Sequence, residues 1–261
     1  IGQIMIRVLF NKKGGVGKSS LAVNLAAISA SQGYTTLLID LDTQCNSTAY
    51  LNATDIPKES SIADLFEQTI TFHLHRRPAS DFCHPTQVPN LDIIPGSERL
   101  AELESELDSR HKIYKLREAL ESLKGTYQHI FIDTAPALNF YSMSALIAAQ
   151  RCLIPIDCDD FARQGLYSLQ LKIAEIKEDH NEDLEIEGII ANQYMTNANL
   201  PKQIVNELIA EGFPVLSEYI GQSVKMRESH QAKKPLVLLA PKHKLTQSLI
   251  GIFELLDKNQ T

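Results

Sequence analysis

Residues 11–20 read Asn-Lys-Lys-Gly-Gly-Val-Gly-Lys-Ser-Ser, and this glycine-rich stretch decides the fold. An apolar run interrupted by Arg7 precedes it, and an alanine-rich apolar run follows it from Leu21. Strand, glycine loop and helix in this order form the context in which such a loop binds phosphate. Glycines let backbone N–H groups turn toward one centre, and the positive end of the helix favours an anion there. Lys18 is then expected to reach the β- and γ-phosphates, and the Ser19 hydroxyl to bind Mg²⁺.

Length and composition are those of an ordinary globular protein. The chain has 261 residues, 44% of them hydrophobic, which suffices for one large domain with a substantial core. It contains no run of about 18 apolar residues, so we expect no transmembrane helix. Because Met5 is a natural start, we expect residues 1–4 to be a remnant ahead of a single domain spanning 5–261.

Charge and cysteine content narrow the class further. The net charge of −7 argues against a wholly basic nucleic-acid module but leaves room for a local basic patch. The four cysteines show neither Cys-x-x-Cys spacing nor histidine partners at the spacing of a zinc site. We therefore expect a reduced, cytoplasmic protein.

Two further apolar runs end in carboxylates. Residues 35–40 end in Asp40, with Asp42 two positions later, and residues 127–133 end in Asp133. Apolar strands separated by helices predict an α/β fold, a mostly parallel twisted sheet with helices on both faces. Ligands of such sheets gather at the carboxyl ends of the strands. Strand alternation puts Asp40 and Asp42 on the same side, facing the nucleotide.

These motifs together resemble the ParA/MinD family of ATPases. Residues 13–19, Lys-Gly-Gly-Val-Gly-Lys-Ser, resemble the deviant phosphate loop of that family, which nitrogenase iron proteins share, and Lys12 stands where the common loop has glycine. Asp40-x-Asp42-x-Gln44 resembles the second signature. The strand ending in Asp133 resembles the Walker B strand, although Asp-Thr-Ala-Pro replaces the usual Asp-x-Pro-Pro.

The resemblance implies a P-loop fold, bound ATP and Mg²⁺, and a homodimer that closes around two nucleotides. It gives catalytic roles to Lys13, which reaches the partner's nucleotide, to Lys18, and to Asp42, which positions the attacking water. Asp133 would hold Mg²⁺ through water, Asp42 is a further candidate for that water shell, and Asp40 would lie near it or pair with Lys18. The loop residues assigned to the nucleotide are Lys13, Gly14, Gly15, Val16, Gly17, Lys18, Ser19 and Ser20.

The fifth apolar strand, residues 185–192, ends in an asparagine. In the MinD branch an asparagine at this strand end reads the adenine, so the resemblance makes Asn192 a candidate for base recognition. An asparagine at a strand end is otherwise a turn residue. Neither Asn-Lys-x-Asp nor Thr-Lys-x-Asp occurs in the chain, which favours ATP over GTP.

The charge changes sign in residues 221–244, where Lys and Arg are opposed by Glu228 alone. This run is the best candidate for contact with a phosphate backbone. Residues 220–225 resemble the ParA segment Ile-Pro-Arg-x-Val-Arg, with Gln222 in place of the first arginine. The resemblance implies non-specific DNA binding, and the alternative is a solvated basic face. The candidate DNA contacts are Lys225, Arg227, Lys233 and Lys234.

The resulting hypothesis is a ParA-like ATPase that dimerises with ATP, binds non-specific DNA and segregates a plasmid, chromosome or protein cargo. A ParB-like or other adaptor would stimulate slow hydrolysis, and the protein would associate with the nucleoid. A MinD-like membrane-positioned ATPase is the alternative, but residues 245–256 lack the basic polar face of a membrane-surface helix. An iron–sulfur carrier and a metabolic ligase or amidase are further classes on this fold.

The rest of the sequence predicts one irregular segment, three further strands and seven helical segments. Residues 69–90 are irregular and rich in histidine, and their spacing fits no metal-ligand template, so we expect a surface loop. We expect strands at 91–94, 153–156 and 215–220. Helices are expected at 19–32, 62–66, 100–124 (as a solvated pair), 137–149, 166–176, 201–212 and 245–256.

Overall fold

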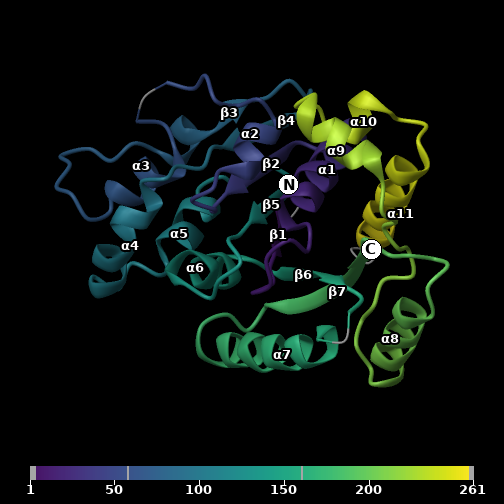
Figure 1. Cartoon of the computed structure of the whole chain (residues 1–261). Helices are drawn as coiled ribbons and strands as arrows, with labels where there is room; N and C mark the ends of the chain where they lie inside the picture. Colours follow the sequence, from purple (N-terminus) through teal and green to yellow (C-terminus); the bar gives the residue numbers. More distant parts are fainter. Residues whose placement is uncertain (1–3, 58, 160, 259–261) are drawn as a thin grey trace.

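A computed structural model describes residues 4–57, 59–159 and 161–258. Its centre is a seven-stranded sheet in the order β3-β4-β2-β5-β1-β6-β7 (Figure 1). Neighbouring strands are parallel except at the edge, where β3 runs antiparallel to β4. The strands are β1 (Met5–Leu9), β2 (Thr36–Asp40), β3 (His84–Pro85), β4 (Leu91–Ile94), β5 (His129–Asp133), β6 (Arg151–Asp157) and β7 (Glu185–Asn192).

Helices cover both faces of the sheet, as the sequence predicts (Figure 1). On one face α1 packs against β5, α10 and α11, and on the other α6 packs against α4, α5 and α7. The helices are α1 (Lys18–Ser31), α2 (Asn46–Tyr50), α3 (Ile62–Glu67), η1 (Ala79–Phe82), α4 (Leu100–Ser109), α5 (Lys115–Glu121), α6 (Phe140–Ala148), α7 (Ala162–Asp179), α8 (Asn199–Ala210), α9 (Val224–Gln231), α10 (Leu236–Leu239) and α11 (Lys244–Lys258).

Alternation along the strands divides the core between the two faces. In β5, Ile130 and Ile132 join the cluster under α3–α7, whereas Phe131 joins the cluster under α1 and α11. Every residue of β2 and β5 is buried, because a parallel sheet covered on both sides leaves no solvated face.

The register of the strands brings the predicted site residues to one edge. Leu9, the last residue of β1, lies opposite Asp133 of β5, and Asp133 lies opposite Asp40 of β2. The glycine loop follows β1 directly. The loop and both carboxylates therefore meet at the carboxyl end of the sheet, as expected.

A buried ion pair links β1, the sheet edge and the last helix. The Arg7 side chain is fully buried and donates to Glu187 of β7 at 2.7 and 2.9 Å, and also to the carbonyl of Leu256 at 3.3 Å. This explains the one charge within the first apolar run. Such a pair fixes relative orientation, since either charge alone would be costly inside the protein.

Most predicted elements are confirmed within a few residues, but the strand predicted at 215–220 is wrong. This segment touches the edge of β7 through one isolated bridge, Val215 to Ile189, and a second bridge joins Gly221 to Tyr194, just beyond the end of β7. Leu216 donates to Ile189, and Ile220 donates to Ala191, while the residues between leave the ladder. Ile4 packs in the core, and residues 1–3 of the expected remnant lie outside the described residues.

Candidate nucleotide-binding site

The backbone of the loop between β1 and α1 depends on glycine. Gly15 and Gly17 have φ of 76° and 90°, in the left-handed region that side chains disfavour. A Cβ on Gly17 would also lie 2.2 Å from Nδ2 of Asn192. Because Gly17 is the N-cap of α1 and offers no side chain, the first N–H groups of the helix stay available to an anion.

Lys18 points its amine back at the loop. The residue is 6% exposed, and its Nζ donates to the carbonyl of Lys13 at 3.1 Å. Burial lowers the pKa of Lys18, while the negative charges of Asp133 and Asp42 oppose that shift. Lys18, Ser19 and Asp42 line one cavity of about 560 Å³. An amine, a hydroxyl and a carboxylate thus converge as the motifs predict.

Asp40 is fully buried and organises the segment that follows β2. One of its oxygens accepts from the backbone N–H of Asp42 at 3.1 Å. The other accepts from the N–H and hydroxyl of Thr48 at 2.9 and 2.7 Å. Asp42 in turn accepts from the N–H of Gln44 at 3.0 Å. Among the described residues Asp40 forms no ion pair with Lys18, so the structure places it behind Asp42 as a support.

Asp133 presents an oxygen that needs a partner. Its Oδ2 accepts from the Ser47 hydroxyl at 2.8 Å, whereas Oδ1 is buried and accepts no hydrogen bond from the residues that the structure describes. Burial and, after it, the negative charge of Asp40 raise the pKa of Asp133 to about 7, against the hydroxyls of Ser19 and Ser47, which lower it. A buried carboxylate oxygen beside a serine hydroxyl is the donor set that Mg²⁺ and its waters prefer. The residues present therefore fit this ion.

Two amide side chains at the end of β7 hold the loop from the other side. Asn192 donates to the carbonyl of Val16, and Gln193 donates to the carbonyl of Gly15, each at 2.9 Å. The candidate for base recognition thus also braces the phosphate loop. Gln193, at φ 52°, was missed by the sequence analysis, although it directly follows Asn192.

Comparison with known proteins agrees with this geometry. A family described as "AAA domain" matches residues 4–186. The chromosome partitioning protein ParA of Myxococcus xanthus is 33% identical over 265 residues, covering 100% of this chain and 90% of that protein. The chain belongs to the ParA family. The sporulation initiation inhibitor protein Soj of Bacillus subtilis is 32% identical over 240 residues, covering 91% and 92% of the two chains.

A solved structure supports the fold of this ParA-family chain. The septum site-determining protein MinD of Pyrococcus horikoshii, in complex with Mg-ADP, superposes with a TM-score of 0.80 at 23% identity. The match covers 99% of this chain and 98% of that one. The α/β P-loop architecture predicted from the sequence is therefore confirmed.

Lys13 of this ParA-family chain is held by carboxylates of its own chain. Its Nζ pairs with Asp159, in the loop after β6, and lies 3.4 Å from Asp157. The hydrogen bond to Asp159 raises the pKa of Lys13. The side chain is 43% exposed, so the amine is accessible from outside the molecule. In the single chain Lys13 thus points to the loop after β6.

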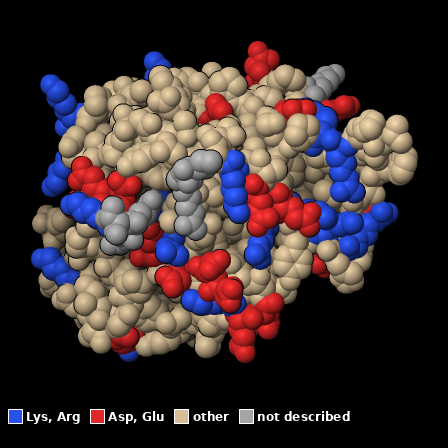
Figure 2. Space-filling model, turned by 180° about the vertical axis from the view of Figure 1, so that it is seen from behind, with Lys and Arg blue, Asp and Glu red and all other residues tan. Residues whose placement is uncertain are grey.

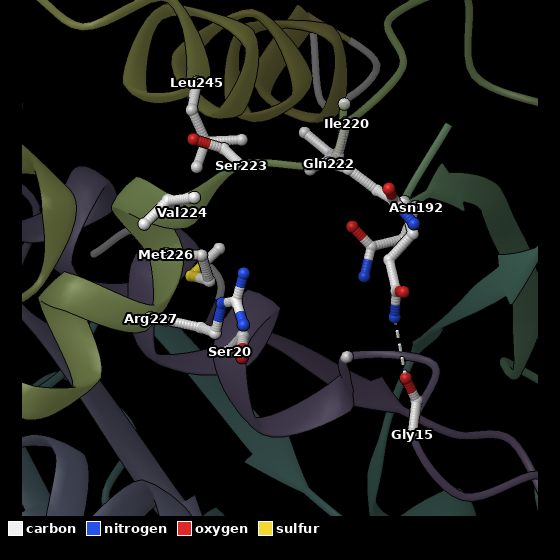
Figure 3. Close-up of a pocket in the computed structure, with 13 residues that line it drawn as sticks. Gly15, Ser20, Asn192, Ile220, Gln222, Ser223, Val224, Met226, Arg227 and Leu245 are labelled. Carbon is white, nitrogen blue, oxygen red and sulfur yellow. Dashed lines mark hydrogen bonds between the residues drawn. The ribbon is translucent and has the colours of Figure 1, made fainter. Parts of the chain in front are cut away.

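The four candidate DNA contacts have different surroundings. Lys225 pairs with Glu228, and Nζ of Lys233 lies 3.3 Å from Oδ1 of Asn52 and lines the phosphate cavity. Arg227 lines a second cavity, of about 640 Å³, with Gly15, Ser20 and Asn192 (Figure 3). Lys234 is exposed. The sequence analysis predicts that these residues contact DNA, and that stays a prediction; the structure adds that α9, which carries two of them, contacts the start of α1.

His230 is a second residue that the sequence analysis missed. The Ser20 hydroxyl and Nε2 of His230 lie 2.9 Å apart, and the His230 ring lies 4.1 Å from that of Tyr50. Burial lowers the pKa of His230, which favours the neutral ring. No local pattern predicts a contact between residues 210 positions apart.

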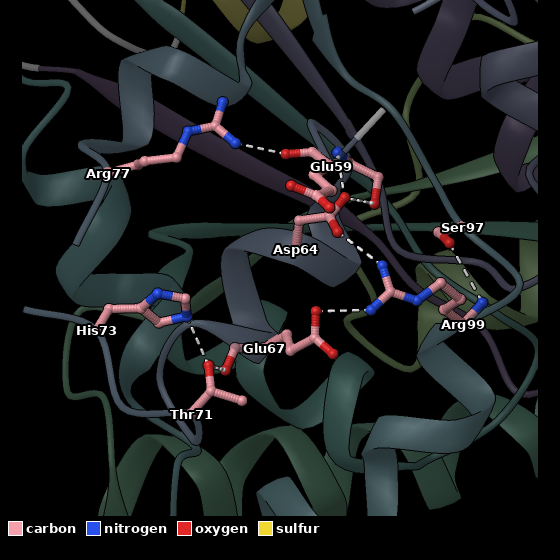
Figure 4. Close-up of polar contacts among 9 residues, drawn as sticks. Glu59, Asp64, Glu67, Thr71, His73, Arg77, Ser97 and Arg99 are labelled. Carbon is pink, nitrogen blue, oxygen red and sulfur yellow. Dashed lines mark hydrogen bonds and ion pairs between the residues drawn. The ribbon is translucent and has the colours of Figure 1, made fainter. Parts of the chain in front are cut away.

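The first part of the histidine-rich segment, residues 71–78, forms an exposed loop as predicted, but the prediction is wrong for its second part, where η1 and the edge strand β3 form and Phe82 is buried in the core. His73 shares a hydrogen bond of 2.7 Å with the Thr71 hydroxyl, and Arg99 nearby bridges Asp64 and Glu67 at 2.6 Å each (Figure 4). Within the described ranges, no group of three or more His, Cys, Asp and Glu side chains is arranged to hold a metal ion.

The four cysteines are free, and burial raises the pKa of each thiol. Thiols of this kind are poor candidates for the thiolates that hold an iron–sulfur cluster. In the part of the chain that the structure describes, no helix is both long and apolar enough to cross a bilayer.

Proposed function

We propose that this ParA-family chain binds ATP with Mg²⁺ and hydrolyses it. The observation that carries the proposal is the buried Oδ1 of Asp133, which lacks a partner among the described residues and lies at the same sheet edge as Lys18 and the glycine loop. The relative MinD, solved with Mg-ADP, supports this assignment. Bound Mg²⁺ would neutralise charge on the phosphates.

Residues of the chain bind the phosphates, hold the metal ion and position the attacking water. Backbone N–H groups of residues 14–20 hold the phosphates, and Lys18 neutralises charge that develops on them. Ser19 and, through water, Asp133 hold the metal ion, and Asp42 positions the attacking water. The Asp40 carboxylate accepts hydrogen bonds from the backbone N–H groups of Asp42 and Thr48 and so keeps the segment that carries Asp42 in place.

ATP binding closes two chains face to face, with Lys13 of each reaching the nucleotide of the other. In the single chain Asp157 and Asp159 hold the amine, so dimerisation exchanges an exposed ion pair for phosphate contacts. Such exposed pairs are weak, about 0.2–1 kcal/mol, and are readily given up.

The ATP-bound dimer binds non-specific DNA through Lys225, Lys233 and Lys234, and an adaptor of the ParB kind stimulates hydrolysis and couples it to cargo. Figure 2 shows basic and acidic side chains interspersed on the face opposite to that of Figure 1, so that face carries mixed charge. Lysines repeated on two subunits add weak phosphate contacts. The full-length similarity to the chromosome partitioning protein ParA supports this role.

The packing of α11 favours DNA over a membrane as the surface to which the dimer binds. Its apolar face is buried in the core under α1. A helix that already uses this face for packing does not present it to lipid. The buried side chains are Leu245, Leu249, Ile252, Phe253 and Leu256.

The test is DNA binding with ATP and Mg²⁺ over a salt series. We expect affinity to fall steeply with salt, because each neutralised phosphate adds about 0.9 to the slope of log K against log salt. Lys225→Glu should lose DNA but keep nucleotide, whereas Lys202→Glu, the same charge change on α8, should retain both. DNA binding by Lys225→Glu equal to that of the wild type would remove this surface from the proposal.

A further inference from the structure

Helix α9 is anchored against the nucleotide loop by contacts from its inner side. His230 meets the Ser20 hydroxyl at 2.9 Å, and Ser229 shares a hydrogen bond with Tyr50 of α2. Ser229 also donates to the carbonyl of Lys234 at 2.5 Å. These contacts fix the distance between α9 and the start of α1. Any side chain on the same side of α9, one turn earlier, therefore has a defined place relative to the loop.

Arg227 occupies that place. It precedes His230 by three residues and so lies on the same side of the helix. Figure 3 shows its guanidinium beside Ser20, directed into the cavity of about 640 Å³. Within the described residues it forms no hydrogen bond or ion pair, in contrast to Lys225, which pairs with Glu228. Its five N–H donors are thus open to a ligand.

The residues that line the cavity of about 640 Å³ indicate which part of a nucleotide it would bind. Lys18, Ser19 and Asp42, which serve the β- and γ-phosphates and the metal ion, line the other cavity. Gly15, Gly17 and Ser20 line both. The rest of the larger cavity combines polar groups that could contact a sugar or base, namely Asn192, Gln193, Gln222 and Ser223, with apolar side chains suited to a base. It includes Ile220, Val224, Met226 and Leu245.

We propose that Arg227 binds the α-phosphate of the bound nucleotide, at the junction of the two cavities. The inference rests on the proposed function in that it needs a nucleotide on this loop. An anion there would meet the N–H groups at the start of α1 from one side and the guanidinium from the other. Since ATP and ADP share the α-phosphate, Arg227 increases the affinity for both nucleotides equally. Through this contact α9 becomes part of the nucleotide site.

The test compares affinities of wild type, Arg227→Ala and Arg227→Lys for fluorescent ATP and ADP analogues with Mg²⁺. Loss of a charge-assisted hydrogen bond should weaken both nucleotides by about tenfold or more in Arg227→Ala. Arg227→Lys should recover part of the loss, because lysine keeps the charge without the planar fork. Arg76→Ala, which removes an exposed arginine from the histidine-rich loop, should bind both as the wild type does.

Other results of this comparison would separate the inference from the proposed function. Unchanged affinity of Arg227→Ala for both nucleotides, or a loss confined to ATP, would overturn the inference. Equal melting temperatures of the variant and the wild type without nucleotide would show that the fold is intact, as expected for an exposed, unpaired side chain. A wild type that binds neither nucleotide would refute the proposed function itself. If Arg227→Ala lost DNA binding but kept its affinity for both nucleotides, Arg227 would be a DNA contact, and the inference would again be overturned.

Discussion

At the scale of single residues, the site rests on side chains that brace the backbone. Asn192 and Gln193 hold two carbonyls of the glycine loop, and Asp40 holds the segment that carries Asp42. The motifs identify the groups that we expect to face the nucleotide. They do not name Gln193, because its role depends on where β7 ends beside β6, a tertiary contact.

Gly15 and Gly17 both have left-handed backbone, but only at Gly17 would a side chain also clash with a neighbour. Gly15→Ala should cost about 1–2 kcal/mol for the left-handed backbone alone, since nothing lies within 4 Å of its new Cβ. Gly17→Ala should cost more and lose nucleotide binding, because its Cβ would meet Asn192. Chemical denaturation and nucleotide titration of the two variants check this. Equal effects would show that the loop yields without cost at Asn192.

Lys13 offers a second prediction at this scale. Asp159→Asn removes its main partner within the chain, so the amine is released for the neighbouring subunit. We expect the variant to dimerise at a roughly two- to fivefold lower protein concentration with ATP, the equivalent of an exposed ion pair. Sedimentation velocity over a concentration series measures this. If the gain persists when Lys13 is also changed to Ala, it does not arise from that amine.

At the scale of elements, two buried carboxylates meet where β2 and β5 end. Desolvation is the main cause that raises the pKa of Asp40 to about 6 and that of Asp133 to about 7. Negative charge on these two carboxylates is therefore unfavourable in the protein alone, and a bound metal ion would stabilise it. The sequence analysis placed both carboxylates at this edge correctly, because strand periodicity and parallel pairing determine it. It could not predict how deeply they are buried.

This burial predicts a pH dependence of the nucleotide-free protein. Both pKa values lie above the usual value of 3.8, so the folded state binds more protons than the unfolded state. The stabilisation is complete below about pH 4 and is lost as the pH rises through 6 to 7. We expect the melting temperature to fall between pH 5 and 8, and Asp133→Asn to melt roughly 5 °C above the wild type at pH 8.

The control for this prediction is Asp183→Asn, which changes an exposed carboxylate in the loop before β7. Its melting temperature should follow that of the wild type at every pH. Parallel pH profiles of the wild type and Asp133→Asn would contradict the burial of charge described here.

At the scale of the whole molecule, the sheet, its helical layers and the position of the loop follow from apolar strands and the spacing between them. What the pattern does not contain is the return of the chain after β7. The segment at 215–220 leaves the ladder, and α9 packs against α1 and α2 through Ser20, Tyr50 and His230. Contacts between distant residues leave no local periodicity in the sequence. The sequence analysis therefore treats the basic run as a free surface, whereas part of it packs against the start of α1.

The central claim is that the nucleotide joins two chains through Lys13, and the mass in solution tests it most directly. Sedimentation equilibrium with a non-hydrolysable ATP analogue and Mg²⁺ should show the wild type doubling from 29.1 kDa. Lys13→Ala should bind the same analogue and remain at the mass of a single chain. A wild type that stays monomeric while saturated with the analogue, or a Lys13→Ala variant that dimerises as the wild type does, would contradict the account.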